Sequence, residues 1–180
     1  MPEGAIRQRP YIFIWIAVFL VISMTMMSSC TRSVTLYFAS VEDNEFYLAP
    51  QTREIDGREN IYEETVRQLI AGPEDEDLYP TLPSSADVNS VMVSEGLATV
   101  DFGISIISDF DEIPHSSATE TLAIYSIVNT LTAFGEIDRV RITIEGAESG
   151  QVEGFYVEDF WGHIGIYEEF TRNEEIIKDE

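Results

Sequence analysis

The sequence predicts an α+β fold in which two helices pack on one face of a small mixed β-sheet. Segments of alternating apolar and polar residues, typical of half-buried strands, flank two segments that have helical spacing and helix-capping residues. The predicted order is strand, strand, helix, two strands, helix, and two or three strands. Helices that cover one face of a sheet bury the apolar side of every element. The 180 residues suffice for one domain of ordinary size.

The first predicted elements are two strands. Residues 34–38 alternate between apolar and more polar side chains, and residues 45–55 form a second extended segment. Pro50 favours an edge position for this second strand, because proline has no backbone N–H to donate to a neighbouring strand.

The first predicted helix follows at residues 60–71. Asn60 is its expected N-cap, with Glu63 at the reciprocal capping position, and Gly72 with Pro73 marks its end. Its apolar residues fall on one half of the helical wheel, which indicates a helix with one buried side.

An acidic connection and a hairpin come next. Residues 74–77 are four adjacent carboxylates, and they lack the spaced oxygen ligands and turn glycine of a calcium loop, so we expect a solvated loop there. Residues 88–102 predict a hairpin that turns around residues 94–96.

The second predicted helix spans residues 117–134. Ser117 is its expected cap, Glu120 closes the capping box, and Gly135 ends it. Residues 121–134 carry no charge, although fourteen residues of this chain's average composition would hold about three charged ones.

One side of this helix is small and neutral rather than apolar. Two interpretations remain open: the helix is buried around most of its circumference, or this side is kept free of charge so that another protein can pack there. The candidate contact residues are Ser126, Asn129, Thr130 and Ala133.

The last third predicts a strand at residues 138–146, then an aromatic hairpin within residues 154–173 and a charged tail. Four aromatic residues of this hairpin are candidates for stacking on a glycan or peptide. They are Phe155, Tyr156, Phe160 and Trp161.

The N-terminus has the features of an export signal. Arg7 and Arg9 precede an uncharged run over residues 11–27, and small residues lead to Cys30, the single cysteine. The sequence Met27-Ser28-Ser29-Cys30 resembles a bacterial lipobox, which makes Cys30 the predicted lipidation site. An uncleaved membrane anchor remains the alternative, because about 17 apolar residues is the lower limit for a spanning helix.

Composition argues against several functions. The formal net charge is −23, so nucleic acid is an unfavourable partner. We expect the acidity to serve solubility, with an acidic site for a cationic ligand as the alternative.

One cysteine and two histidines make a metal site held by this chain improbable, and we predict no metal or cofactor. His115, beside Ser116, and His163 have plain structural explanations, so no catalytic residue is assigned and the chain is predicted not to be an enzyme.

Several segments together resemble the GerM domain of bacterial sporulation and germination proteins and related lipoproteins. The strongest match is ETLAIYSIVNTLTAF at residues 120–134, and the second is the G-x-A-x-V-D-F hairpin at residues 96–102. Shorter matches are LYF, TREI, LIAGP, P-x-L-P and FTRN.

The resemblance implies a fold similar to ring-building-motif domains, no catalytic residues, and a structural or interactive role at the outer face of the cytoplasmic membrane. This chain holds one copy of the domain where the sporulation protein has two. The predicted organisation is a lipoprotein signal peptide at 1–29, a lipid anchor and linker at 30–33, a GerM-like domain at 34–173, and a charged tail at 174–180.

The favoured function is therefore a noncatalytic membrane-tethered scaffold or interaction module. It contacts the membrane through lipid on Cys30, and it binds another envelope protein or itself. A glycan- or peptide-binding envelope lipoprotein is the alternative.

Overall fold

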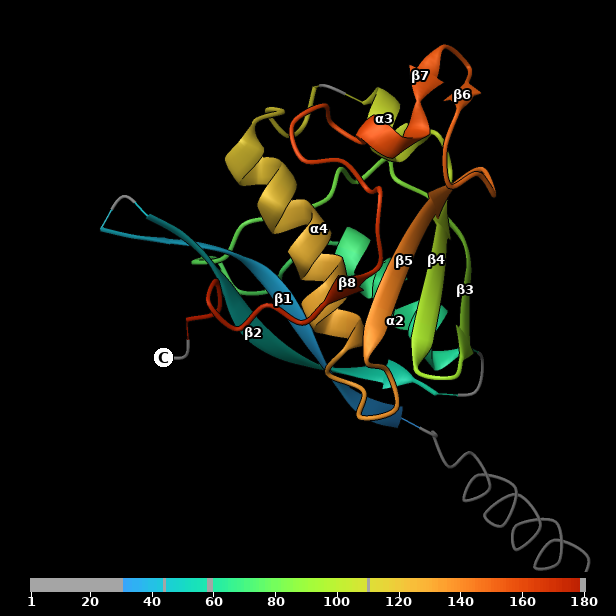
Figure 1. The fold of residues 1–180 in the computed structure, drawn as a ribbon. Helices are drawn as coiled ribbons and strands as arrows, with labels where there is room; N and C mark the ends of the chain where they lie inside the picture. Colours follow the sequence, from blue (N-terminus) through green and yellow to red (C-terminus); the bar gives the residue numbers. More distant parts are fainter. Residues whose placement is uncertain (1–30, 44, 58–59, 110, 179–180) are drawn as a thin grey trace, which may run out of the picture. The chain divides into compact units, whose positions relative to one another are not determined.

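The computed structural model describes residues 31–43, 45–57, 60–109 and 111–178. These belong to one compact unit, which begins at Thr31. The predicted signal peptide and Cys30 lie outside the described residues. The principal elements are β1 (Thr31–Glu42), β2 (Glu45–Asp56), α2 (Ile61–Ile70), β3 (Val88–Ser94), β4 (Leu97–Phe102), α3 (Ser105–Ser108), α4 (Ser117–Leu131), β5 (Arg139–Ile144), β6 (Gln151–Val152), β7 (Phe155–Tyr156) and β8 (Phe170–Thr171) (Figure 1).

The predicted α+β class is confirmed, with the strands divided between more than one sheet. The main sheet has the order β3-β4-β5-β8, in which β4 and β5 are parallel and the other two pairings are antiparallel. The β1 and β2 strands form a separate antiparallel sheet, and β6 and β7 form a small hairpin. The aromatic hairpin expected within residues 154–173 is therefore wrong, because β7 pairs with the earlier β6 and β8 pairs with β5. Both α2 and α4 contact strands of the main sheet and of the β1–β2 hairpin. The helices therefore share one core with both sheets.

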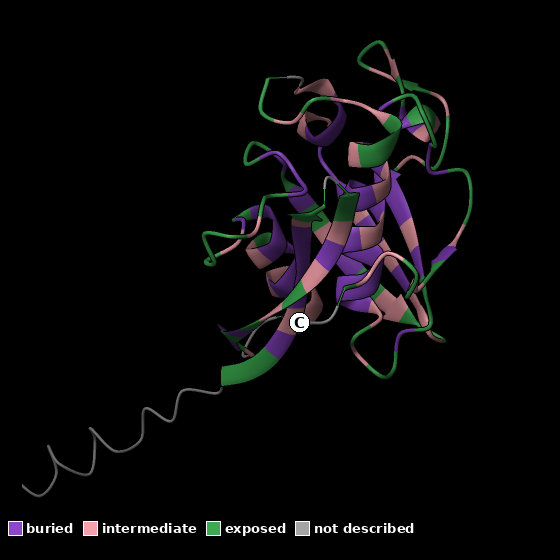
Figure 2. Cartoon of the chain, turned by 90° about the vertical axis from the view of Figure 1, so that its left-hand side faces the viewer, coloured by how far each residue is buried: buried purple, intermediate pink, exposed green. Residues whose placement is uncertain are grey.

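The apolar residues of the predicted strand alternation are buried, and Tyr37 and Thr143, which lie between them, are buried as well. Val34, Leu36 and Phe38 are at most 5% exposed, and Val140 and Ile142 in β5 are equally well covered. Figure 2 shows the buried residues concentrated in the strands and in α4, while the connecting loops are mostly exposed. Each such fully buried aliphatic or aromatic side chain contributes about 1.5–3 kcal/mol of hydrophobic stabilisation.

The α2 helix begins as predicted, with one difference in its cap. The side-chain oxygen of Asn60 accepts hydrogen bonds from the backbone N–H groups of Tyr62 and Glu63, and its amide donates to the Val91 carbonyl of β3. Glu63 does not complete a capping box, because its carboxylate instead forms an ion pair with Arg67 one turn later. The cap residue thereby joins α2 to the main sheet.

The start of α4 corrects the predicted cap by one residue. Ser116 is the N-cap, its side chain accepts from the Thr119 N–H, and the Thr119 hydroxyl accepts from the Ser116 N–H. Glu120 therefore has no capping role. The helix also ends at Leu131, three residues before the predicted end.

Both ends of the domain extend beyond the predicted boundaries. The strand β1 already includes residues 31–33, which were expected to form a linker. At the other end, Leu48 of β2 donates to the Ile176 carbonyl over 2.7 Å and accepts from the Lys178 N–H over 3.0 Å. The described part of the predicted charged tail is therefore attached to the edge of β2.

Candidate functional site

The β1–β2 hairpin has one face that turns toward α4 and is apolar up to the tip. Ala39 is paired with Leu48 across the two strands, and both side chains are buried with Leu122 of α4. The next pair on the same face is Val41 with Phe46, because residues two apart in a strand share a face. These two side chains are 45% and 54% exposed. The apolar face thus continues past the part that α4 covers.

A groove of about 390 Å³ lies beside this exposed pair. Its lining also includes Leu122 from α4 and Ile113 and Pro114 from the loop before α4. Tyr79 forms a further part of the wall, and its side chain is itself 54% exposed. Because the chain folds with this much apolar surface in contact with water, the groove is the strongest candidate for a binding site among the described residues.

The groove is held in place by backbone hydrogen bonds. The Ala39 N–H donates to the Tyr79 carbonyl over 3.1 Å, and the Tyr79 N–H donates back to Ala39 over 2.8 Å. Glu112, which also lines the groove, accepts hydrogen bonds of 2.6 Å from both the N–H and the hydroxyl of Ser84. These contacts fix the position of these lining residues before any partner binds.

Carboxylates surround this apolar surface. Glu112 lines the groove and is exposed, and the hairpin tip carries Glu42, Asp43 and Glu45. A hydrogen bond from the Tyr47 phenol to Glu45 raises the pKa of that phenol above its usual range. Lys178 forms an ion pair with Glu42, so one of the four carboxylates has a basic partner within the chain.

The small neutral side of α4 is not the free surface that one interpretation of the sequence expected. The side chains of Ser126, Asn129 and Thr130 are fully buried, and only Ala133, beyond the end of the helix, is exposed. Ser126 accepts a 2.8 Å hydrogen bond from the Thr81 hydroxyl. The other interpretation, a helix buried around most of its circumference, describes this structure.

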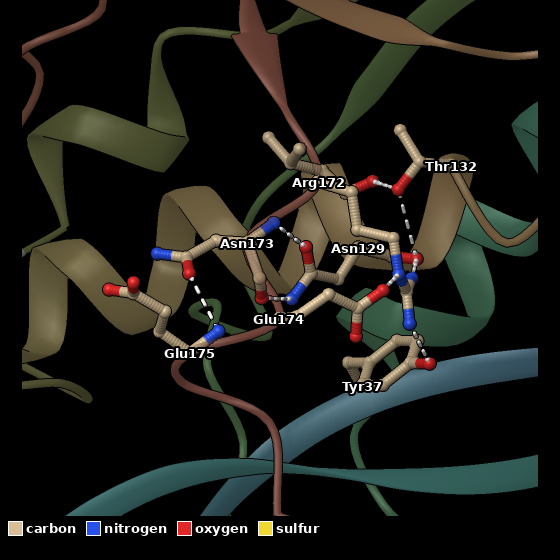
Figure 3. Close-up of polar contacts among 8 residues, drawn as sticks. Tyr37, Asn129, Thr132, Arg172, Asn173, Glu174 and Glu175 are labelled. Atoms are coloured by element: carbon tan, nitrogen blue, oxygen red, sulfur yellow. Dashed lines mark hydrogen bonds and ion pairs between the residues drawn. The ribbon is translucent and has the colours of Figure 1, made fainter.

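Polar groups from distant parts of the chain explain why this side of α4 is small and neutral. The Thr130 hydroxyl accepts a 3.0 Å hydrogen bond from the Tyr37 N–H of β1. The Asn129 side chain pairs with the backbone of Asn173, and Arg172 donates to the Asn129 carbonyl and to the Tyr37 hydroxyl (Figure 3). A charged residue here would lose its hydration without the matching partners.

The four candidate stacking residues do not form one exposed platform. Phe160 and Trp161 are 5% and 6% exposed, and the Trp161 indole N–H donates to the Ile106 carbonyl over 2.8 Å. Phe155 is partly buried against the core, and Tyr156 alone is well exposed, at 57%. Buried rings cannot stack on a ligand, so the structure does not favour the glycan-binding alternative.

Glu120 has a role that local sequence reasoning missed. Its side chain is fully buried, and its two carboxylate oxygens accept hydrogen bonds of 2.8 Å from the backbone N–H groups of His163 and Gly165. This carboxylate therefore fixes the loop that contains His163 and Gly165, here called the aromatic loop, to the start of α4. In the sequence, the only indication of this role is that Glu120 is a charged residue directly before the uncharged residues 121–134.

The two histidines have structural surroundings. His115 stacks on Trp161 with ring centroids 4.4 Å apart, and burial lowers the pKa of its imidazole. Ser116, its neighbour, uses its hydroxyl as the α4 cap rather than as a nucleophile. Within the described ranges, no group of three or more histidine, cysteine or acidic side chains is arranged to hold a metal ion.

The fold and the groove define a class of protein: a small α+β domain with a preformed apolar groove on its surface. The family model for Germane, described as sporulation and spore germination, matches residues 35–150, and the chain belongs to this family. The resemblance to the GerM domain is thereby confirmed. No curated protein matches the chain.

Solved structures support the same fold. The tandem GerMN domains of the sporulation protein GerM from Bacillus subtilis match with a TM-score of 0.63 and 21% identity, over 84% of this chain and 49% of that one. The first GerMN domain of the same protein matches with a TM-score of 0.50 and 23% identity, over 73% of this chain and 97% of that one. The chain thus spans about half the length of the tandem structure.

None of the helices in the described part of the chain is both long and apolar enough to cross a membrane. The apolar run at residues 11–27, on which the export prediction rests, lies outside that part.

Proposed function

We propose that the chain is a noncatalytic interaction module that is tethered to the cell envelope and captures a partner protein in the hairpin groove. The observation that carries this proposal is the exposure of Val41 and Phe46 beside a preformed apolar hollow. Membership of the Germane family supports a task in sporulation or germination. The histidines have structural contacts, which supports a binding function rather than catalysis.

The tether in this proposal is lipid on Cys30, at the outer face of the cytoplasmic membrane. Since β1 begins at Thr31, the residue directly after Cys30, a lipidated chain would have no flexible linker of its own before the domain. The groove lies toward the other end of β1, about 33 Å from Thr31 at the usual rise per residue. A partner at the groove would therefore meet the end of the hairpin that is remote from Thr31.

The tether can be tested by metabolic labelling. Cells that produce the full chain should incorporate labelled palmitate into it, and Cys30→Ser should abolish the label. Palmitate that remains on the Cys30→Ser variant would contradict lipidation at this residue.

The binding function can be tested by purifying the tagged full chain from membranes. The double variant Val41→Ser/Phe46→Ser should lose its co-purifying protein, because both apolar anchors are removed. Met92→Ser is the matched control, since Met92 is 64% exposed on β3, away from the groove. Equal recovery from the double variant and the control would contradict a partner site at the groove.

A further inference from the structure

The hairpin tip combines two kinds of surface that a partner would have to match. Val41 and Phe46 present apolar side chains, and the residues between them include Glu42, Asp43 and Glu45. Strand alternation directs the Glu42 and Glu45 side chains to the opposite face of the hairpin. Lys178 already pairs with Glu42, so the unbalanced charge at the tip comes from Asp43 and Glu45. The Glu45 charge acts across this two-stranded layer, because screening at physiological salt extends over about 8 Å.

Glu112, an exposed residue of the lining, adds a further negative charge at the edge of the groove. Glu112 lines the hollow, and its two hydrogen bonds to Ser84 hold the carboxylate in place. Among the described residues that line the groove there is no lysine or arginine, so none of them repels a bound cation. Apolar walls with an acidic surround fit an apolar segment that has basic ends.

We propose that the groove binds a segment of a different protein in which apolar side chains are flanked by lysine or arginine. This inference rests on the proposed function, and it adds the chemistry of the partner. The apolar side chains fill the hollow between Phe46 and Ile113. The basic flanks lie near the hairpin tip and near Glu112, where they meet opposite charge.

The negative charge of this chain favours a basic partner over a second copy of the chain as the occupant of the groove. Each copy has a formal net charge of −23, and the surface around the groove is acidic. Two copies that met at their grooves would bring these carboxylates together, which is unfavourable. A basic partner gains from the same charges, and its association accelerates at low salt.

The test uses the full chain in nanodiscs of neutral phosphatidylcholine. The probe is a fluorescently labelled synthetic peptide with a leucine-rich centre and lysines at both ends, and its matched control carries glutamates in place of the lysines. Fluorescence anisotropy, corrected with empty nanodiscs for partition into lipid, gives the affinities. The lysine peptide should bind at least about tenfold more tightly than the glutamate peptide.

Variants assign the binding to the groove. Val41→Ser/Phe46→Ser should weaken the lysine peptide about tenfold or more, whereas Met92→Ser should leave its affinity unchanged. Asp43→Asn should weaken it less, and added salt should reduce that difference. Circular dichroism melting of each variant checks that it is folded. If the double variant melts early, Tyr79→Ser replaces it, because the Tyr79 backbone hydrogen bonds do not need the ring.

The inference would be overturned by equal affinity for the two peptides, by binding that the groove variants do not change, or by a dimer of the chain that Phe46→Ser dissociates. A photocrosslink from position 46 to residues 1–30 of the same chain would also overturn it, because the occupant would then be internal. If the lysine peptide fails while the co-purifying protein still depends on Phe46, the partner chemistry is wrong and the proposed function stands.

Discussion

The side-chain amide of Asn129 pairs with the backbone of Asn173 through two hydrogen bonds, each 2.9 Å long. The pair joins the buried side of α4 to the segment that follows β8 (Figure 3). Arg172 reinforces the junction by donating to the Asn129 carbonyl over 2.9 Å and to the Tyr37 hydroxyl over 2.6 Å. One asparagine thereby connects a helix, the C-terminal segment and, through Arg172, the hairpin that carries the groove.

Replacing Asn129 by alanine should destabilise the fold. Both partner groups on Asn173 would lose their hydrogen bonds in a partly buried position, which costs about 3 kcal/mol in total. Urea unfolding followed by circular dichroism measures the loss. Asn89→Ala is the matched control, because Asn89 makes an exposed side-chain hydrogen bond to Asp101. An equal loss in the two variants would contradict the structural role of Asn129.

Glu120→Gln should destabilise the start of α4 by about 1–3 kcal/mol, because a charged acceptor is lost and one N–H of the aromatic loop then faces an amide group. The change in unfolding free energy should exceed that of Glu63→Gln. Glu63 belongs to an ion pair of the i,i+4 type, which is worth about 0.5 kcal/mol at most. A loss from Glu120→Gln no greater than the loss from Glu63→Gln would show that the carboxylate does not hold the loop.

His115 should make the stability of the domain depend on pH below neutrality. Burial lowers the pKa of its imidazole from 6.5, although the Asp109 backbone and the Glu120 charge oppose this. The unfolded chain then binds more protons, so this contribution to stability is fully present above pH 6.5 and is lost as the pH falls from there through the lowered pKa. His115→Phe retains a ring to stack on Trp161 and should remove this contribution. The prediction fails if wild type and variant lose stability in parallel between pH 7 and 5.

Most of the strands and both long helices could be predicted because their signals are local, whereas the strand partners of residues 155–156 and 170–171 lie outside the hairpin expected there. Residues 34–38 alternate by themselves, and Asn60 caps the helix that directly follows it. The α4 cap was misplaced because two overlapping patterns, from Ser116 to Thr119 and from Ser117 to Glu120, both satisfy the spacing of a capping box. Glu120 is committed elsewhere, to backbone groups more than forty residues later that no local pattern indicates.

The groove could not be predicted, because it depends on how far the hairpin extends past α4. The sequence shows that apolar alternation continues to Val41 and Phe46, but only the packed fold shows that this pair stays exposed beside the helices of the described residues. For the neutral side of α4, burial could be predicted but the groups that cover it could not. Absence of charge indicates burial, and the covering groups come from Tyr37, Thr81 and Asn173, which are distant in sequence.

The central claim is that a partner binds at the hairpin groove and not on α4. The most direct measurement places a photoreactive amino acid at position 46 or at position 133 of the full chain and compares the crosslinks formed in living cells. Ala133 is the exposed member of the candidate set on and after α4, so it is the fair comparison. We expect position 46 to capture a distinct protein and position 133 to give background only. Capture from position 133 with none from position 46 would contradict the account.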